Sequence, residues 1–195
     1  LAKPFLKGNN ANSKFNFYDL TAKVNYTINT KNTVFVSGYF GRDVFGTGFG
    51  FDWGNTTLTT RWNHVFSNKL FLNATAFYSN YDYMLDSDIE NKRPNDAFKW
   101  TSNIENLSIK PDFTYYWRPD NTITFGGQLL SYDFTPGKAN ATSNGEKREF
   151  GQANKKGIEA SAYVGHDWKI SPRLTVQYGV RYSHYDYKSL NGEYY

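Results

Sequence analysis

The sequence predicts an all-β fold, namely an antiparallel transmembrane β-barrel segment of about eight strands. Side chains alternate between apolar and hydrophilic over segments of about 9–11 residues, the length of a tilted strand that crosses a bilayer. The apolar sides of seven such segments contain no Lys, Arg, Asp or Glu. The connections also alternate between short and long, as do the periplasmic turns and extracellular loops of bacterial barrels.

The composition is compatible with a barrel but does not require one. The chain has 195 residues, of which 19% are aromatic, with 16 Tyr, 16 Phe and only one Met. Many aromatic side chains on an otherwise polar chain suit a barrel with aromatic girdles and a wet interior. A soluble β-sandwich rich in Tyr and Thr would look similar. The absence of cysteine excludes disulfides and thiolate metal sites.

Charge and hydropathy exclude two other classes. The net charge is +4, but the basic residues form no dense block, so we expect no nucleic-acid partner. No segment approaches the ~18–20 apolar residues of a transmembrane helix. The first residues lack the basic and apolar regions of a signal peptide. We take this as a first indication that the chain is a fragment of an exported protein.

The first expected strand covers residues 18–28. Tyr18, Leu20, Ala22, Val24, Tyr26 and Ile28 fall on one face, whereas the residues between them are hydrophilic. This run is about twice as long as an ordinary soluble strand. The second strand is expected at about 33–41, where the alternation does not reveal which face is apolar.

Six further strands repeat the pattern. They cover residues 57–66, 70–79, 107–117, 122–129, 158–168 and 174–183. Charged residues such as Lys23, Lys110 and Arg181 lie on the hydrophilic faces. An Arg or Lys that faces lipid at the bilayer midplane costs about 2–4 kcal/mol, so their exclusion favours lipid over a soluble core. Pro111 has no N–H for the ladder, and we expect a bulge or local kink there.

The connections orient the chain. The short ones are 29–32, 67–69, 118–121 and 169–173, and the long ones are about 42–54, 82–98 and 135–156. The first strand ends at a short turn and the eighth follows one, so both chain ends are expected outside the cell. We expect 1–14 in one extracellular loop, 15–187 in barrel strands and loops, and 188–195 in the next loop, with the plug domain absent. Eight strands would be about a third of the ~22 strands of a plugged transporter.

A resemblance to a known family adds to this interpretation. Residues 160–187, ASAYVGHDWKISPRLTVQYGVRYSHYDY, resemble the barrel of TonB-dependent receptors. The matching residues are Tyr163, Val164, Asp167, Trp168, Lys169, Leu174, Thr175, Gly179, Arg181 and Tyr182. Asp167 departs from the pattern by one place. Residues 17–45 and 52–83 look like the barrels of Bacteroidetes-type receptors.

The resemblance implies a location and a function. A TonB-dependent receptor of the bacterial outer membrane would take up a nutrient such as a siderophore, haem, a vitamin, a glycan or a peptide. Its partners would be outer-membrane lipid, the TonB–ExbB–ExbD complex acting through the missing plug, and a surface lipoprotein. We expect no cofactor and no enzymatic activity. The alternatives are a passive pore or structural barrel, and a secreted soluble β-sheet binding protein.

Aromatic residues supply the candidate site residues. Those of the long connections could stack on a ligand or pack the loops on themselves; they are Phe45, Phe49, Phe51, Trp53, Tyr81 and Tyr83. Those close to the short turns are expected at the membrane interface; they are Tyr26, Trp62, Phe66, Trp117 and Trp168.

No catalytic or metal constellation emerges. His64, His166 and His184 do not have the spacing of a metal motif. Asp86, Asp88 and Glu90 could offer oxygens to Ca²⁺, but the turn glycine of a calcium loop is missing. We therefore expect a solvated acidic loop rather than a metal site.

Overall fold

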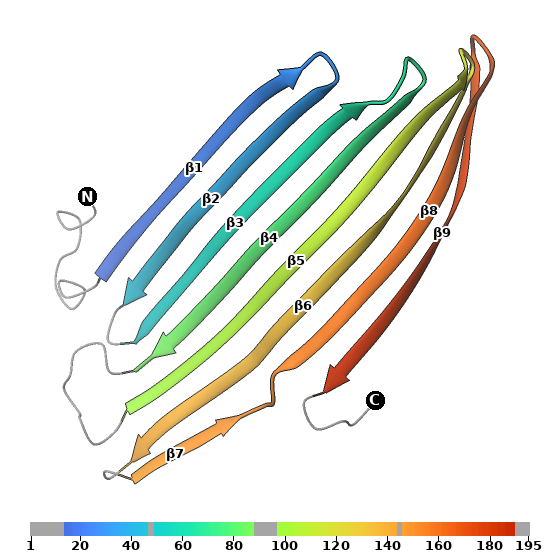
Figure 1. The fold of residues 1–195 in the computed structure, drawn as a ribbon. Coiled ribbons are helices and arrows are strands. Elements are labelled where there is room, and N and C mark those ends of the chain that lie inside the picture. The colour runs from blue at the N-terminus through green and yellow to red at the C-terminus, as the bar shows by residue number, and fades with distance from the viewer. Residues whose placement is uncertain (1–13, 47–48, 88–96, 144–145, 190–195) are drawn as a thin grey trace.

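A computed structural model describes residues 14–46, 49–87, 97–143 and 146–189. These residues form one antiparallel nine-stranded sheet in the order β1-β2-β3-β4-β5-β6-β8-β9, with β7 paired to β6 (Figure 1). No helix in this part of the chain is long and apolar enough to cross a membrane. The predicted all-β antiparallel fold is confirmed, and the described strands form an open sheet.

The strands are longer than the sequence pattern indicated. Their bounds are β1 Lys14–Asn29, β2 Asn32–Gly46, β3 Gly50–Val65, β4 Leu70–Asp86, β5 Ala97–Arg118, β6 Asn121–Ser143, β7 Glu146–Gly151, β8 Lys155–Ser171 and β9 Leu174–Ser189. Each of the eight expected strands is present, and β7 is an additional short strand.

The four short connections are tight turns at one end of the sheet (Figure 1). Side chains satisfy the backbone groups that the turns leave free. Asn29 Oδ1 accepts a hydrogen bond from the backbone N–H of Lys31 at 2.9 Å. Ser67 Oγ accepts the backbone N–H groups of Lys69 and Leu70, each at 3.2 Å. Short Asn and Ser side chains stabilise turns in this way, so the turn chemistry of the sequence is realised here.

The expected long loops are mostly strand, which corrects the sequence interpretation. β2 and β3 run to Gly46 and from Gly50, so the connection expected at 42–54 shrinks to residues 47–49. The segment expected as a loop at 135–156 contains the end of β6, the whole of β7 and the start of β8. These extensions continue the ladder with aromatic, glycine and charged residues. Because these residues no longer alternate between apolar and polar, the alternation pattern did not identify the extensions as strand.

β7 and β8 lie along the same edge of β6 and share one register. Lys138 pairs with Gly151, and Phe134 pairs with Lys155. The break between them coincides with Pro136, which has no N–H to donate, and with Gly137, whose φ is 153°. A Cβ on Gly137 would also lie 2.1 Å from Cζ2 of Trp100. Glycine is required here for both the backbone conformation and the close approach of the indole.

Pro111 does not cause the expected bulge. The register between β5 and β6 is the same at Ile109↔Leu129 and at Asp112↔Gly126, so no residue is inserted. Only the direct pairs between these positions are lost, and β4 still pairs with Pro111 through Ala74. Gly126 approaches this part of β5 closely, because a Cβ on Gly126 would lie 2.4 Å from the Pro111 carbonyl oxygen.

Direct strand partners share a face, and this settles the orientation of β2. Leu20 pairs with Phe40 and Val24 with Val36, so Val36 and Phe40 lie on the apolar face of β1. We call this face, which also carries Leu58, the outer face. Its apolar side chains are exposed: Leu20 is 67% and Val24 64% accessible. The opposite, hydrophilic face is called the inner face. An extensive exposed apolar face is expected of strands that contact lipid.

Candidate functional site

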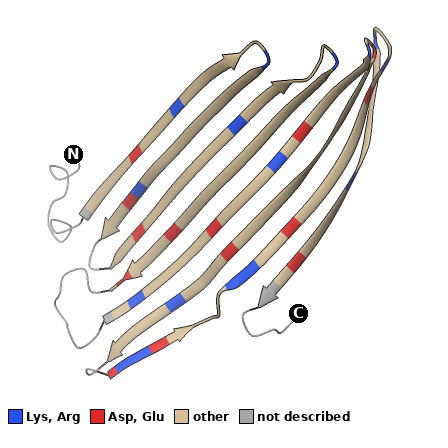
Figure 2. Ribbon diagram, viewed as in Figure 1, with Lys and Arg blue, Asp and Glu red and all other residues tan. Residues whose placement is uncertain are grey.

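The apolar part of the outer face ends at a common level, beyond which charged residues begin. In β2 Phe40 is followed on this face by Arg42, and in β8 Ile158 is preceded by Lys156. The residues at this level are called the outer charged row; they are Arg42, Asp52, Asp82, Glu105, Asp133 and Lys156. Figure 2 shows where charges fall along the strands. Charges on the outer face are costly in hydrocarbon, so this row marks the level at which the strands leave the apolar layer.

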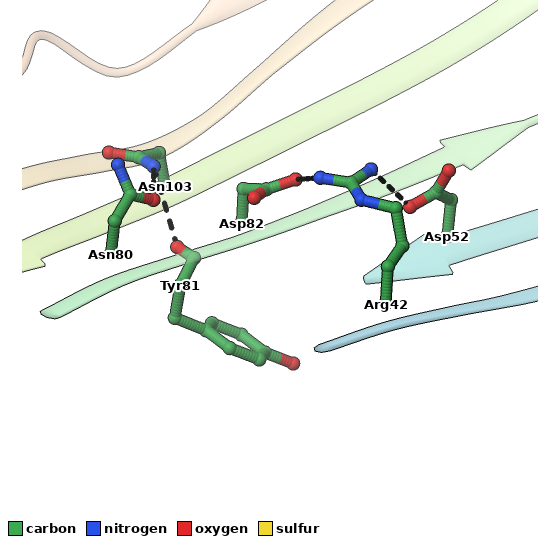
Figure 3. Close-up of polar contacts among 6 residues, drawn as sticks. All are labelled: Arg42, Asp52, Asn80, Tyr81, Asp82 and Asn103. Carbon is green, nitrogen blue, oxygen red and sulfur yellow. Dashed lines mark hydrogen bonds and ion pairs between the residues drawn. The ribbon is translucent and has the colours of Figure 1, made fainter. Parts of the chain in front are cut away.

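Five of the six residues of the outer charged row form ion pairs. Arg42 reaches Asp52 Oδ1 with Nη1 at 2.6 Å and Asp82 Oδ2 with Nη2 at 2.7 Å, which joins β2, β3 and β4 (Figure 3). Lys156 Nζ lies 2.8 Å from Asp133 Oδ2. The hydrogen bond to Asp133 raises the pKa of Lys156. Each cation of the row is therefore neutralised within the sheet.

The five predicted interface aromatics lie close to the tight turns and are exposed. Tyr26 is 66%, Trp62 40%, Phe66 47%, Trp117 48% and Trp168 42% accessible. Two of them contact polar neighbours. Trp62 Nε1 donates to Asn32 Oδ1 at 3.0 Å, and the guanidinium of Arg118 lies 5.0 Å from the Trp117 ring centre. An aromatic ring with a polar contact suits a membrane–water boundary, and their interfacial role stays a prediction.

Five of the six predicted ligand-binding residues gather on the inner face, at the strand ends away from the turns. They form the aromatic wall: Phe45, Phe51, Trp53, Tyr81 and Tyr83. Register places Phe45 beside Phe51 and Trp53 beside Tyr83. The ring centres of Phe51 and Trp53 are 4.6 Å apart, and those of Phe51 and Tyr83 are 6.2 Å apart. The aromatic wall is thus a continuous surface across three strands.

The sixth residue, Phe49, lies outside the strands that carry this wall. It follows β2 in the connection to β3 and is 45% accessible. Two residues that the sequence analysis did not select extend the wall instead. Phe15 packs on Phe45 with ring centres 4.8 Å apart, and Trp100 donates from Nε1 to the Tyr83 hydroxyl at 3.2 Å. Both were missed because they lie outside the expected strands and outside the long connections from which the candidates were chosen.

A polar network crosses the inner face halfway along the strands. It consists of two groups: Ser108, Gln128, Ser161 and Arg181 in one, and Lys110, Asp112 and Tyr163 in the other. Asp112 accepts a hydrogen bond from the Tyr163 hydroxyl. It also forms an ion pair with Lys110, whose Nζ lies 3.2 Å from Asp112 Oδ2. Arg181 donates to Ser161 Oγ at 2.7 Å. The sequence prediction that Lys110 and Arg181 lie on the hydrophilic face is confirmed. Such a face suits a wet lumen.

His64 and His166 bond to neutral groups. His64 Nδ1 lies 2.7 Å from Asn32 Oδ1, and His166 contacts the Tyr178 hydroxyl and Asn121 Oδ1, each at 2.8 Å. No group of three or more His, Cys, Asp or Glu side chains that could hold a metal occurs within the described ranges.

The weak calcium candidate is only partly described. Asp86 is the last residue of β4, where it pairs with Lys99. Asp88 and Glu90 lie outside the described residues.

Comparisons with known proteins define the class. The family model "TonB dependent receptor-like, beta-barrel" matches residues 4–194. A search of curated proteins gave no match. The copper transporter OprC superposes with a TM-score of 0.69 at 13% identity, over 87% of this chain and 28% of that one.

Two other solved structures have the same fold. BauA, the ferric preacinetobactin receptor from Acinetobacter baumannii, gives a TM-score of 0.63 at 9% identity, over 90% of this chain and 34% of that one. FyuA, the ferric yersiniabactin uptake receptor from Yersinia pestis, gives 0.51 at 11% identity, over 87% and 35%. Such identities show the fold alone. The chain spans roughly a third of the length of these proteins.

The exposed apolar outer face, the hydrophilic inner face and the tight turns at one rim define a wall of an outer-membrane β-barrel. The family match then identifies the family: the chain belongs to the TonB-dependent receptor β-barrels. Proteins of this family are receptors and transporters of the bacterial outer membrane rather than enzymes.

Proposed function

We propose that this chain is part of the barrel wall of a Bacteroidetes-type receptor that takes up a nutrient by TonB-dependent active transport. The observation that carries the proposal is the aromatic wall on the inner face, at the rim opposite the tight turns. In a barrel of this orientation that rim faces the outside of the cell. Aromatic surfaces interspersed with a few polar groups are typical of ligand sites.

The nutrient belongs to one of five classes: siderophores, haem, vitamins, glycans or peptides. The polar network on the inner face would line the lumen beside a plug domain, through which the TonB–ExbB–ExbD complex supplies energy. Outer-membrane lipid covers the outer face in this proposal, and a surface lipoprotein is a further partner. The family match favours energised uptake over the passive pore.

Energy dependence tests the proposal against a passive pore. Cells that express the full-length receptor are given radiolabelled candidates from the five classes, with and without a protonophore. We expect one class to accumulate with saturation and to stop accumulating when the proton-motive force collapses. Uptake that is linear in concentration and unaffected by the protonophore contradicts the proposal and favours the pore.

Trp53 should contribute directly to capture of the nutrient. Trp53→Ala removes a large ring from the aromatic wall, where it contacts Phe51. Burying such a ring against a ligand contributes about 1.5–3 kcal/mol, so we expect the KM for uptake to rise about tenfold or more. Trp168→Ala on the outer face is the matched control and should leave the KM unchanged. Equal effects of the two substitutions argue against a ligand role for the wall.

A further inference from the structure

A hollow lies on the inner face, at the same rim as the aromatic wall and next to it, because Tyr81 of the wall pairs with Ile104 of the hollow's lining. It has a volume of about 570 Å³ and is lined by β5, β6, β8 and β9. We call it the β8 hollow. Gly157 forms its floor, because this residue pairs with Tyr132 on one side and Tyr187 on the other. Figure 1 shows β4, which carries part of the aromatic wall, beside β5, and the register of β4, β5 and β6 places the wall and the hollow on the same side of the sheet.

Tyrosine rings make the sides of the β8 hollow flat and apolar. The ring centres of Tyr132 and Tyr185 are 6.3 Å apart, with an interplanar angle of 63°. A Cβ on Gly157 would lie 2.6 Å from the Tyr185 hydroxyl oxygen. The absence of a side chain at this position therefore allows the Tyr185 ring to lie across the floor and keeps the hollow open. Phe134 adds a further ring to the lining.

The charges around the β8 hollow are unequal. The carboxylate of Glu159 already accepts a hydrogen bond from the Tyr132 hydroxyl at 3.2 Å. Lys156 also contributes to the lining, but its ammonium belongs to the outer charged row, where Asp133 neutralises it. Lys155, by contrast, is a half-buried residue of the lining, and among the described residues its ammonium has neither an ion pair nor a hydrogen bond. An ammonium without an anionic partner can donate to an anionic ligand.

We propose that the β8 hollow binds a ligand that combines a flat ring with an anionic group such as a carboxylate. Tyr132 and Tyr185 offer flat surfaces to the ring, and Lys155 offers a charge-assisted hydrogen bond to the anion. The inference rests on the proposed function, since it makes the hollow a ligand subsite of the receptor lumen.

Two probes test the charge preference in the purified full-length receptor. The probes are 2-naphthoate and its neutral counterpart 2-naphthamide, with binding measured by equilibrium dialysis in detergent. We expect 2-naphthoate to bind about tenfold more tightly, as befits one charge-assisted hydrogen bond. Lys155→Met keeps the length of the side chain but removes its charge, and it should abolish the preference. Lys156→Met, one residue along and engaged on the other face, should preserve it.

Three outcomes overturn the proposal: no measurable binding of 2-naphthoate, equal binding of both probes by the unaltered receptor, or equal effects of the two lysine substitutions. Unchanged heat-modifiable gel mobility establishes that each variant is folded. The dialysis needs no energy source. If energised uptake is absent but the probe preference is intact, only the proposed function is contradicted. If both probes bind equally but energised uptake is intact, only the proposed ligand site in the β8 hollow is contradicted.

Discussion

Leu58→Lys should destabilise the barrel in the membrane. Leu58 is on the outer face, 50% accessible, about midway between Trp62 near the tight turns and Asp52 of the outer charged row. A lysine that faces hydrocarbon at this depth costs about 2–4 kcal/mol. We expect the denaturant midpoint of the full-length receptor, refolded into lipid vesicles, to fall by an amount that corresponds to this free-energy cost.

Thr59→Lys is the matched control for this substitution. Thr59 is the next residue of β3, but it lies on the inner face with Ser37 and Phe77 as its direct partners. The new ammonium would therefore point into the wet lumen, and the midpoint should change little. If both lysines destabilise the receptor equally, the assignment of the outer face to lipid is wrong.

Gly126→Ala should destabilise the sheet although it adds only one methyl group. Its Cβ would lie 2.4 Å from the Pro111 carbonyl oxygen and 3.0 Å from the Tyr163 hydroxyl oxygen. The first contact is with backbone, so β5 and β6 must separate to relieve it. Tyr163 cannot move away without disturbing its hydrogen bond to Asp112. Overpacking of this kind costs about 1–3 kcal/mol, which denaturant titration in vesicles would measure as a lower midpoint.

Gly38→Ala provides the comparison for the crowding argument. A Cβ on Gly38 would meet only the Thr57 carbonyl oxygen, at 3.6 Å, which is an ordinary contact distance. We expect this variant to match the unaltered receptor, or to exceed its stability slightly through the lower entropy of the unfolded chain. A Gly126→Ala variant as stable as Gly38→Ala would show that β5 and β6 are not in close contact at Pro111.

The faces of the strands could be predicted because alternation is a local property of the sequence. In β1, Leu20 and Val24 identify the outer face without knowledge of any neighbour. The facing of β2 stayed open because its own residues are mixed, and it follows only from pairing with β1, as in Val24↔Val36. Strand ends were misjudged for a physical reason. The exclusion of charge from the outer face ends where the apolar layer ends, whereas backbone pairing continues past Arg42.

The candidate site was only partly accessible to sequence reasoning. Trp53 and Tyr83 could be selected because aromatic residues are dense in their segments, although only strand pairing shows that they are neighbours. The β8 hollow was not predicted because Tyr132 and Tyr185 lie far apart in the sequence and meet across β8. The opposite roles of Lys155 and Lys156 depend on the register that resumes after the break between β7 and β8.

The central claim, that one face of this sheet contacts lipid and the other lines a lumen, is tested most directly by a cysteine scan along β8. The 195 residues contain no cysteine, so each introduced thiol is unique within this segment. A spin label is attached at successive positions from 156 to 164 of the full-length receptor in membranes, and its collisions with oxygen and with a water-soluble nickel chelate are compared. We predict that labels at Ile158, Ala160, Ala162 and Val164 collide with oxygen, whereas labels at the positions between them do not. A label at Lys156 should collide with the chelate. Equal chelate exposure on both faces throughout this stretch would contradict the account.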